Sequence, residues 1–383
     1  MPVQCCQRPG LCCLGTRASH FRLPGWARSA PARRRGPPPF RGGGPGEPAS
    51  GQLPATLTIA AIAYPFEGQQ RYQGQNAIVQ QQGWLEGELA KRGVKLQWFR
   101  VATAVGGPVV NEGFAAKRID FASYGDFPAI IAIAGGVDLR LVVPVGRGQN
   151  AYLVVRNGVA ANSIKDLKGK RIALHRGRPW ELPFAKLAEA NGLKLSDFRI
   201  LNINPPASHA ALASGDVDAV FLLSDAHLLV EKKVGRIIWS TKQAPQSWKM
   251  RAELFGRGDF VDSHPELTQL VADAYVRAQS WSADPANREK VIEITSRAES
   301  PRSVIEAELD EPRVAWGDRY SPLYDDFMVA HYRDAAAYTF DQGLVRKKID
   351  VDKLLDRRFA TAALDRLKLK DQWKPDTAEA AAR

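Results

Sequence analysis

The sequence contains little cysteine. Its 383 residues include four, namely Cys5, Cys6, Cys12 and Cys13, and all of them precede residue 14. Residues 53–383 therefore hold no thiol that could act as a nucleophile, form a disulfide or bind a metal ion. The two cysteine pairs are adjacent and lack the CxxC spacing of structural zinc sites.

Sequence motifs of catalysis and cofactor binding are also missing. The six histidines show neither HxxxH nor HxH spacing, so no metal site is predicted. The chain has no GxSxG, Walker or GxGxxG motif, and so no cofactor is predicted. These absences favour a binding protein over an enzyme.

Long apolar segments and clustered charge are absent as well. No window approaches the ~18 apolar residues of a membrane span. Residues 1–52 hold eight arginines and one glutamate, so they carry +7 of the net charge of +12 and leave +5 for residues 53–383. Acidic and basic residues are well mixed there, and nucleic acid is not a predicted partner.

Residues 1–52 are rich in arginine, proline and glycine and show no apolar period, so this tail is predicted to be disordered. An exported protein would carry an apolar stretch of about 7–15 residues near its start. The LCCLG segment at 11–15 is too short. Either the start is misplaced, or the chain stays inside the cell.

The rest of the chain contains two runs of alternating strands and helices. The first has predicted strands at 57–63, 94–101, 119–122 and 139–143, with helices at 77–92, near 107–118 and from 127. The second has strands at 170–174, 198–203, 217–222 and 236–239, with helices at 182–191, 207–214 and 226–233. Short apolar strands between helices predict open, largely parallel sheets, an α/β fold.

Beyond residue 240 the strands are predicted to cease. Ser263-His-Pro-Glu266 reads as a capping box that opens a helix through Trp281, and further helices start near Ser300 and Ser321. Segments 114–121 and 212–219 each end a helix and enter a strand at an aspartate, which favours two similarly built lobes. Such lobes bind ligands at the carboxyl ends of their strands, here in a cleft between them.

The first lobe offers two helix starts as candidate anion sites. Ser123 and Gly125 follow a strand directly, and Gly106 and Gly107 form a second turn before a helix. Unpaired N–H groups give a helix start a partial positive charge. Asp126 is predicted as an N-cap residue, and whether it also touches a ligand stays open.

The remaining candidates lie in three other loops. Arg178 could pair with an oxyanion, and Trp180 could cover an apolar group, both between a strand end and a helix start. The loop after the first strand supplies an aromatic wall and an amide from Tyr64, Phe66 and Gln69, with Glu67 between them, and Asp225 completes the set.

Four segments in order resemble the solute-binding proteins of ABC importers for aliphatic sulfonates, taurine and nitrate. They are NEGF, IDF and YGDFPAIIA within 111–136, SIKDLKGKRIA at 163–173, ASGDVDA at 213–219 and GLVRKKID at 343–350. The resemblance runs through residues 57–355. It implies a bilobal periplasmic-binding-protein fold of type II, with two doubly wound lobes, a two-segment hinge near 144–152 and 241–251, and extra C-terminal helices.

The resemblance also implies domain boundaries and a function. Residues 53–145 plus 243–383 would form lobe 1, and 150–242 lobe 2. The protein would be a periplasmic monomer without cofactor or catalysis that captures a small organic anion of the sulfonate type. The partner would be an ABC permease in the inner membrane, which recognises the closed form.

Two departures from the resemblance concern the ligand. Segment 178–181 reads RPWE where similar sulfonate binders often carry serines, and segment 223–225 reads LSD where they tend to show Trp-Asp-Pro. A ligand with an aromatic or extended tail is therefore expected.

Three alternatives stay open. One is a desulfinase-like enzyme on the same scaffold, although such enzymes use a cysteine that the loop at 64–76 lacks. The others are a binder of thiamine-pyrimidine precursors and a cytoplasmic ligand sensor.

Overall fold

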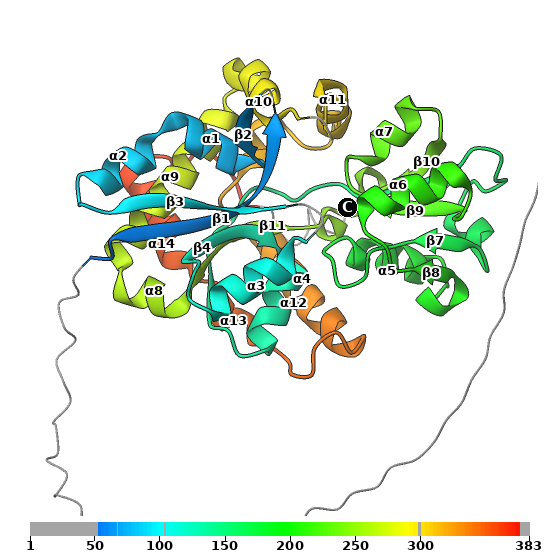
Figure 1. Cartoon of the computed structure of the whole chain (residues 1–383), viewed down its shortest axis with the longest axis horizontal. Coiled ribbons are helices and arrows are strands. Elements are labelled where there is room, and N and C mark those ends of the chain that lie inside the picture. Colours follow the sequence, from blue (N-terminus) through cyan, green and yellow to red (C-terminus); the bar gives the residue numbers. More distant parts are fainter. Residues whose placement is uncertain (1–52, 67, 103–104, 298–299, 376–383) are drawn as a thin grey trace, which may run out of the picture. The chain divides into compact units, whose positions relative to one another are not determined.

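The computed structural model describes residues 53–66, 68–102, 105–297 and 300–375, which form two β-sheets flanked by helices (Figure 1). The predicted tail at 1–52 and Glu67 lie outside the described residues. No helix in the described part of the chain has the length and apolar character needed to cross a membrane.

The first sheet has the strand order β2-β1-β4-β11-β5, and β3 also pairs with β1. Strand β1 runs parallel to β3 and β4, whereas β11 runs antiparallel to both β4 and β5. The strands are β1 (Thr56–Phe66), β2 (Gln69–Tyr72), β3 (Lys95–Val101), β4 (Phe121–Gly125), β5 (Leu139–Val143) and β11 (Ala252–Arg257).

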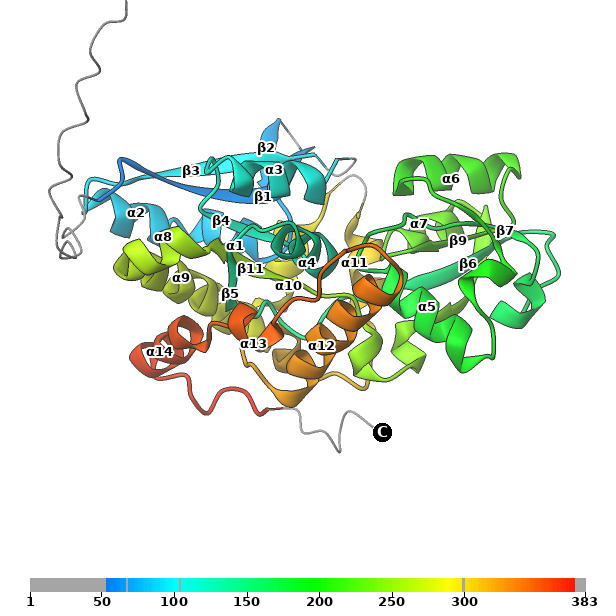
Figure 2. The same cartoon turned by 90° about the horizontal axis from the view of Figure 1, so that it is seen from below.

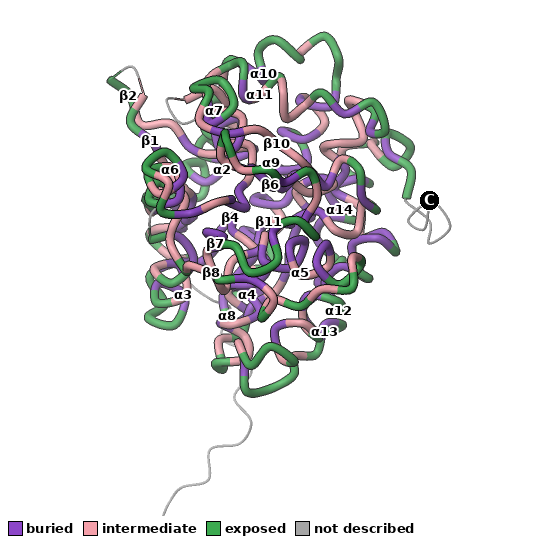
Figure 3. The backbone as a smooth tube through the Cα atoms, turned by 90° about the vertical axis from the view of Figure 1, so that its right-hand side faces the viewer, coloured by how far each residue is buried: buried purple, intermediate pink, exposed green. Residues whose placement is uncertain are grey.

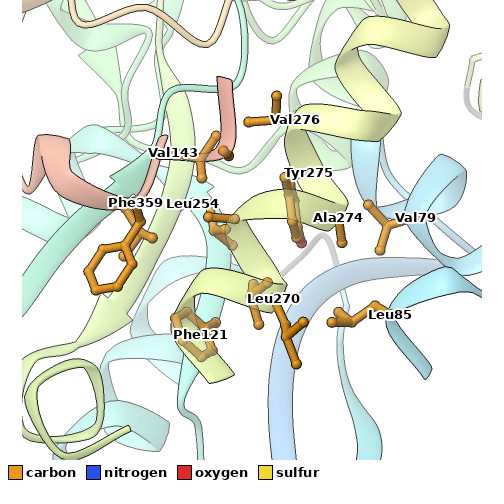
Figure 4. Close-up of a cluster of buried hydrophobic side chains, with 14 of the residues drawn as sticks. Val79, Leu85, Phe121, Val143, Leu254, Leu270, Ala274, Tyr275, Val276 and Phe359 are labelled. Atoms are coloured by element: carbon orange, nitrogen blue, oxygen red, sulfur yellow. The ribbon is translucent and has the colours of Figure 1, made fainter. Parts of the chain in front are cut away.

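Helices cover both faces of this sheet and complete the first lobe. One core cluster packs the sheet against α1 (Gln75–Gln82), α2 (Trp84–Ala90), α9 (Pro265–Ala283) and α14 (Arg357–Leu367). Figure 4 shows Leu270 and Tyr275 of α9 in this cluster with Phe121 and Leu254 of the sheet. The opposite face packs against α3 (Gly107–Ala115), α4 (Asp126–Ala134), α12 (Asp326–Asp341) and α13 (Val351–Leu354).

The second lobe has its own sheet, with the order β10-β6-β9-β7-β8. Its strands are β6 (Tyr152–Arg156), β7 (Arg171–Ala173), β8 (Arg199–Leu201), β9 (Ala219–Leu222) and β10 (Gly235–Ser240). One face packs against α5 (Glu181–Ala190), and the other against α6 (Pro205–Ser214) and α7 (Ala226–Glu231). Most residues of β4, β6 and β11 are buried and purple in Figure 3, whereas most residues of β3, β8 and β10 are intermediate or exposed.

Two crossover segments join the lobes and pair with each other. The Gln149 N–H donates to the Met250 carbonyl (2.8 Å), and the Met250 N–H donates to the Gln149 carbonyl (3.1 Å). Helix α11 (Arg302–Leu309) supports this hinge, since Glu308 accepts hydrogen bonds from the N–H and the side-chain amide of Asn150. The other two helices are α8 (Gly258–Ser263) and α10 (Arg288–Thr295).

The paired aspartates of the sequence repeat make the same contacts in the two lobes. The Thr58 N–H donates to Asp120 Oδ2 (2.8 Å), and the Arg171 N–H donates to Asp218 Oδ2 (2.9 Å). Each aspartate N–H in turn donates to the carbonyl of the same partner. Each carboxylate thus accepts from an N–H of a neighbouring parallel strand, which supports two similarly built lobes.

Several local predictions are wrong. The predicted loop at 64–69 is an antiparallel hairpin, in which Tyr64 opposes Arg71 and Phe66 opposes Gln69. The predicted helix at 77–92 is two helices, because Gly83 adopts φ +63°. Strands do not cease after residue 240, since β11 lies between β4 and β5.

The capping box at 263–266 is also wrong. The Ser263 hydroxyl donates to the Asp259 carbonyl of α8, and α9 begins only at Pro265. The Ser263 side chain is thus bonded within the short helix α8, whereas the sequence pattern assigns it to the start of α9. The predicted residue boundaries of the lobes stay predictions.

The two aspartates predict opposite pH dependences of stability. Hydrogen bonds from Arg171 lower the pKa of Asp218, so its stabilisation is present above the unfolded value of about 3.9 and is lost on acidification. Asp218→Asn should cost about 1.5–3 kcal/mol at neutral pH, and urea denaturation should show this deficit shrinking as the pH falls.

Asp120→Asn is the matched comparison. Burial raises the pKa of Asp120 despite Arg257 and the Thr58 N–H, so protonation stabilises the native state as the pH falls. The stability of the unsubstituted protein relative to this variant should therefore increase on acidification. Parallel pH profiles for the two variants would contradict the assignment.

Candidate functional site

The start of α3 is the first candidate site for an anion. Gly106 precedes the helix with φ +48° and ψ −130°, a conformation that favours glycine, and Pro108 stands in the first turn without an N–H. No described residue outside the helix accepts a hydrogen bond from the N–H of Gly107 or Val109. With the helix dipole, these groups can bind an anion.

The guanidinium of Arg178 lies over this helix start. Its Nη2 donates to the Val105 carbonyl (3.3 Å), and a Cβ atom placed on Gly106 would lie 3.0 Å from Nη1. Arg178 belongs to the second lobe, in the turn between β7 and α5. The structure thus brings three of the predicted site residues together, namely Gly106, Gly107 and Arg178.

The charge of Arg178 is not compensated by a carboxylate among the described residues. Burial alone lowers the pKa of its guanidinium. Burial and the neighbouring Arg178 also lower the pKa of His175 to about 4, so His175 is neutral at physiological pH. A half-buried cation beside open amides is a site where an anion gains both charge and hydrogen bonds.

The start of α4 is already occupied by its own aspartate. Gly125 is the N-cap residue, so the prediction of Asp126 as N-cap is wrong. The Asp126 N–H donates to the Arg251 carbonyl (3.1 Å), and Asp126 Oδ1 accepts from the Phe127 N–H (2.6 Å). Because Pro128 has no N–H, the first turn keeps little capacity for a ligand.

The Asp126 side chain is fully buried and paired with a histidine. Its Oδ2 lies 2.6 Å from His331 Nε2, and both side chains have no exposed surface. His331 Nδ1 lies 3.2 Å from the Ser247 carbonyl, which can only accept, so Nδ1 carries a proton. The pair ties α4 and α12 to the second crossover segment, and Asp126 could reach a ligand only by leaving it.

Other predicted residues flank the Arg178 contact. A Cβ atom on Gly125 would lie 2.3 Å from Pro179, so the second lobe also touches the start of α4. Ser123 stays partly exposed in β4. The buried Nε1 of Trp180 has no hydrogen-bond partner within the described chain and remains a free donor.

Of four other predicted site residues, three make contacts with residues other than Arg178 and one is exposed. The guanidinium of Arg297 stacks 4.3 Å from the ring centre of Tyr64, and that of Arg71 stacks 4.5 Å from Phe66, so this hairpin packs beside the C-terminal end of α10. Gln69 is exposed at the start of β2. Asp225 pairs with His209 of the second lobe (2.9 Å). None of these contacts joins them to Arg178.

Sequence patterns missed the residues that support the site. Glu181, Tyr338 and His331 are polar side chains in helices, and His331 lies 205 positions from its partner Asp126. Of the three, only Glu181 could have been suspected from the sequence, because it lies in the RPWE segment, where similar sulfonate binders often carry serines. Two surface hollows of about 190 and 320 Å³ are lined by none of the predicted residues.

Comparisons with known proteins agree with this architecture. The profile of the NMT1-like family matches residues 74–296. A putative aliphatic sulfonates-binding protein of Bacillus subtilis (strain 168) is 25% identical over 291 residues, which cover 75% of this chain and 84% of that protein.

Among solved structures, one is a putative periplasmic sulfonate-binding protein, SsuA, of a sulfonate ABC transporter from Methylobacillus flagellatus KT. It is 45% identical, with a TM-score of 0.78 over 84% of this chain and 97% of that one. The desulfurization enzyme DSZB shares the fold at 16% identity and a TM-score of 0.63, over 82% of this chain and 99% of that one. The predicted bilobal periplasmic-binding-protein fold is confirmed.

The buried Asp126–His331 pair predicts a large stability loss when one partner is removed. His331→Ala leaves a buried carboxylate unpaired, and we expect a loss of about 3–5 kcal/mol in urea denaturation. His209→Ala is the control, because its partner Asp225 is partly exposed and such pairs contribute about 1 kcal/mol or less. Equal losses in the two variants would contradict the assignment.

Proposed function

The chain belongs to the NMT1-like family, and from that premise we propose that it is the substrate-binding component of an ABC importer that captures a small organic anion of the sulfonate type. The uncompensated guanidinium of Arg178 over the open start of α3 carries this proposal. A sulfonate offers one negative charge and three acceptor oxygens, which match a guanidinium fork and several N–H groups.

Binding would replace a hydrogen bond that Arg178 forms with the protein itself when no ligand is present. Arg178 donates to the Val105 carbonyl, a neutral acceptor, at 3.3 Å. An anion between Arg178 and the N–H groups of Gly107 and Val109 would replace this contact by charge-assisted hydrogen bonds from both lobes. Because the ligand would then contact both lobes, it would favour the closed arrangement over the open one.

The remaining parts of the proposal follow from the importer role. The protein would act in the periplasm, and its closed form would dock onto an ABC permease. It would carry out no reaction on the ligand, since residues 53–383 lack a thiol nucleophile and relatives such as the Bacillus subtilis protein are named as binding proteins. Fractionation of the native host separates this role from a cytoplasmic sensor.

A thermal-shift screen tests the anion proposal directly. The panel should contain taurine, butanesulfonate, benzenesulfonate, nitrate, benzoate and an aminopyrimidine. An anion at 100 times its dissociation constant should stabilise the protein by about 2.7 kcal/mol. Stabilisation by the aminopyrimidine alone would favour the precursor-binding alternative, and no stabilisation by any anion would refute the proposal.

Arg178→Ala should weaken binding of the best sulfonate by about 1.5–3 kcal/mol, measured by calorimetric titration. Arg199→Ala is the charge-matched control, since Arg199 is exposed at the first residue of β8, at the other end of its strand from the carboxyl edge. Equal effects of the two substitutions would show that Arg178 acts only through the net charge.

A further inference from the structure

The turn that carries Arg178 is held by the buried side chain of Glu181. Glu181 Oε1 accepts from Arg176 Nε (2.5 Å), and Oε2 accepts from the Gly177 N–H (2.6 Å). The Glu181 N–H donates to the Arg178 carbonyl (2.9 Å). The Glu181 side chain has no exposed surface, so these bonds form away from water and fix the turn on both sides of Arg178.

Glu181 also accepts a hydrogen bond from the first lobe. The hydroxyl of Tyr338 on α12 donates to Glu181 Oε1 (3.2 Å). Burial and the adjacent carboxylate raise the pKa of Tyr338, so the protonated phenol is the donor. Lys186 of α5 and Asp334 of α12 form an ion pair between the same two helices, which lie side by side in Figure 2.

An apolar cluster surrounds this contact and spans both lobes. Leu182, the residue after Glu181, packs with Phe127 and Ile130 of α4 and with Ala335 of α12. The ring of Tyr338 lies 5.8 Å from that of Phe127. The Glu181–Tyr338 hydrogen bond therefore requires that α5 rests on α4 and α12, as it does in this structure.

We propose that Glu181 is a positioning residue for Arg178 and that Tyr338 engages it on closure, so that contact between α5 and α12 sets the geometry of the anion-binding turn. The proposal rests on the function proposed above and adds a route by which closure acts on the ligand. Opening would remove the Tyr338 donor from Glu181. The turn that presents the guanidinium would then loosen, and the ligand would leave faster.

Tyr338→Phe tests the proposal, and Tyr332→Phe is its matched control. Both tyrosines lie on α12, but the buried hydroxyl of Tyr332 has no hydrogen-bond partner among the described residues. With benzenesulfonate as probe, stopped-flow and calorimetric titration should show dissociation about tenfold faster for Tyr338→Phe, as expected for a hydrogen bond to a charged group. The control should change it less than about twofold.

A double variant shows whether the effect passes through Arg178. In an Arg178→Ala background, Tyr338→Phe should weaken binding no further, because the guanidinium it positions is gone. A purely structural effect would lower affinity equally in both backgrounds and would overturn the proposal. Hydrogen exchange of the Gly177 amide gives a second readout. It should rise in Glu181→Gln with or without ligand, in Tyr338→Phe when the protein is saturated with benzenesulfonate, and not in Tyr332→Phe.

The two proposals can fail separately. If the unsubstituted protein binds no anion of the panel, the proposed function is refuted, whatever the exchange of Gly177 shows. If it binds benzenesulfonate and Tyr338→Phe behaves like Tyr332→Phe in dissociation and exchange, the positioning role is refuted alone.

Discussion

The return of the chain into its first sheet is the constraint on which the rest of the structure depends. Strand β11 pairs with β4 and β5 after the second sheet is complete, so two crossover segments must run side by side between the lobes. All helices after β11 then build on the first lobe or its hinge. This return places α12 beside α4, and it keeps the turns at the strand ends of both lobes within reach of each other.

Buried charges are paired differently at the candidate site and at the residues that support it. Buried charges in the hinge and around the site are neutralised by a nearby partner, as a low-dielectric interior requires. These ion pairs are Arg251–Glu253, Lys249–Glu311 and Arg176–Glu181, and the buried Asp126 is hydrogen-bonded to His331. Arg178 is half-buried, and the described residues offer it no carboxylate and offer the nearby amides of Gly107 and Val109 no acceptor outside the helix. That imbalance is the reason that we propose an anion site at Arg178, whereas the other pairs are structural.

The outcome for the two helix starts shows why sequence patterns alone are ambiguous. Gly106-Gly107-Pro108 and Ser123-Tyr124-Gly125-Asp126 both read as polar turns before apolar helices. Of the two, the first has N–H groups without an acceptor among the described residues outside the helix, whereas Asp126 fills the first turn of α4 with its own carboxylate. The aspartate can do so because His331, distant in sequence, supplies a buried partner for its charge.

Alternating apolar strands and helices, with aspartates at equivalent strand entries, determined the α/β class, the two lobes and the family resemblance. Such signals are local, since burial of one face imposes a period on neighbouring residues. Strand β11 was missed because Glu253 and Arg257 interrupt its apolar pattern. Glu253 pairs with Arg251 of the same segment, whereas Arg257 pairs with Asp120, which is distant in sequence. The tertiary structure alone decided that Arg178 meets α3 and that Glu181 meets Tyr338, because those contacts join segments whose separation along the chain leaves no periodic signal.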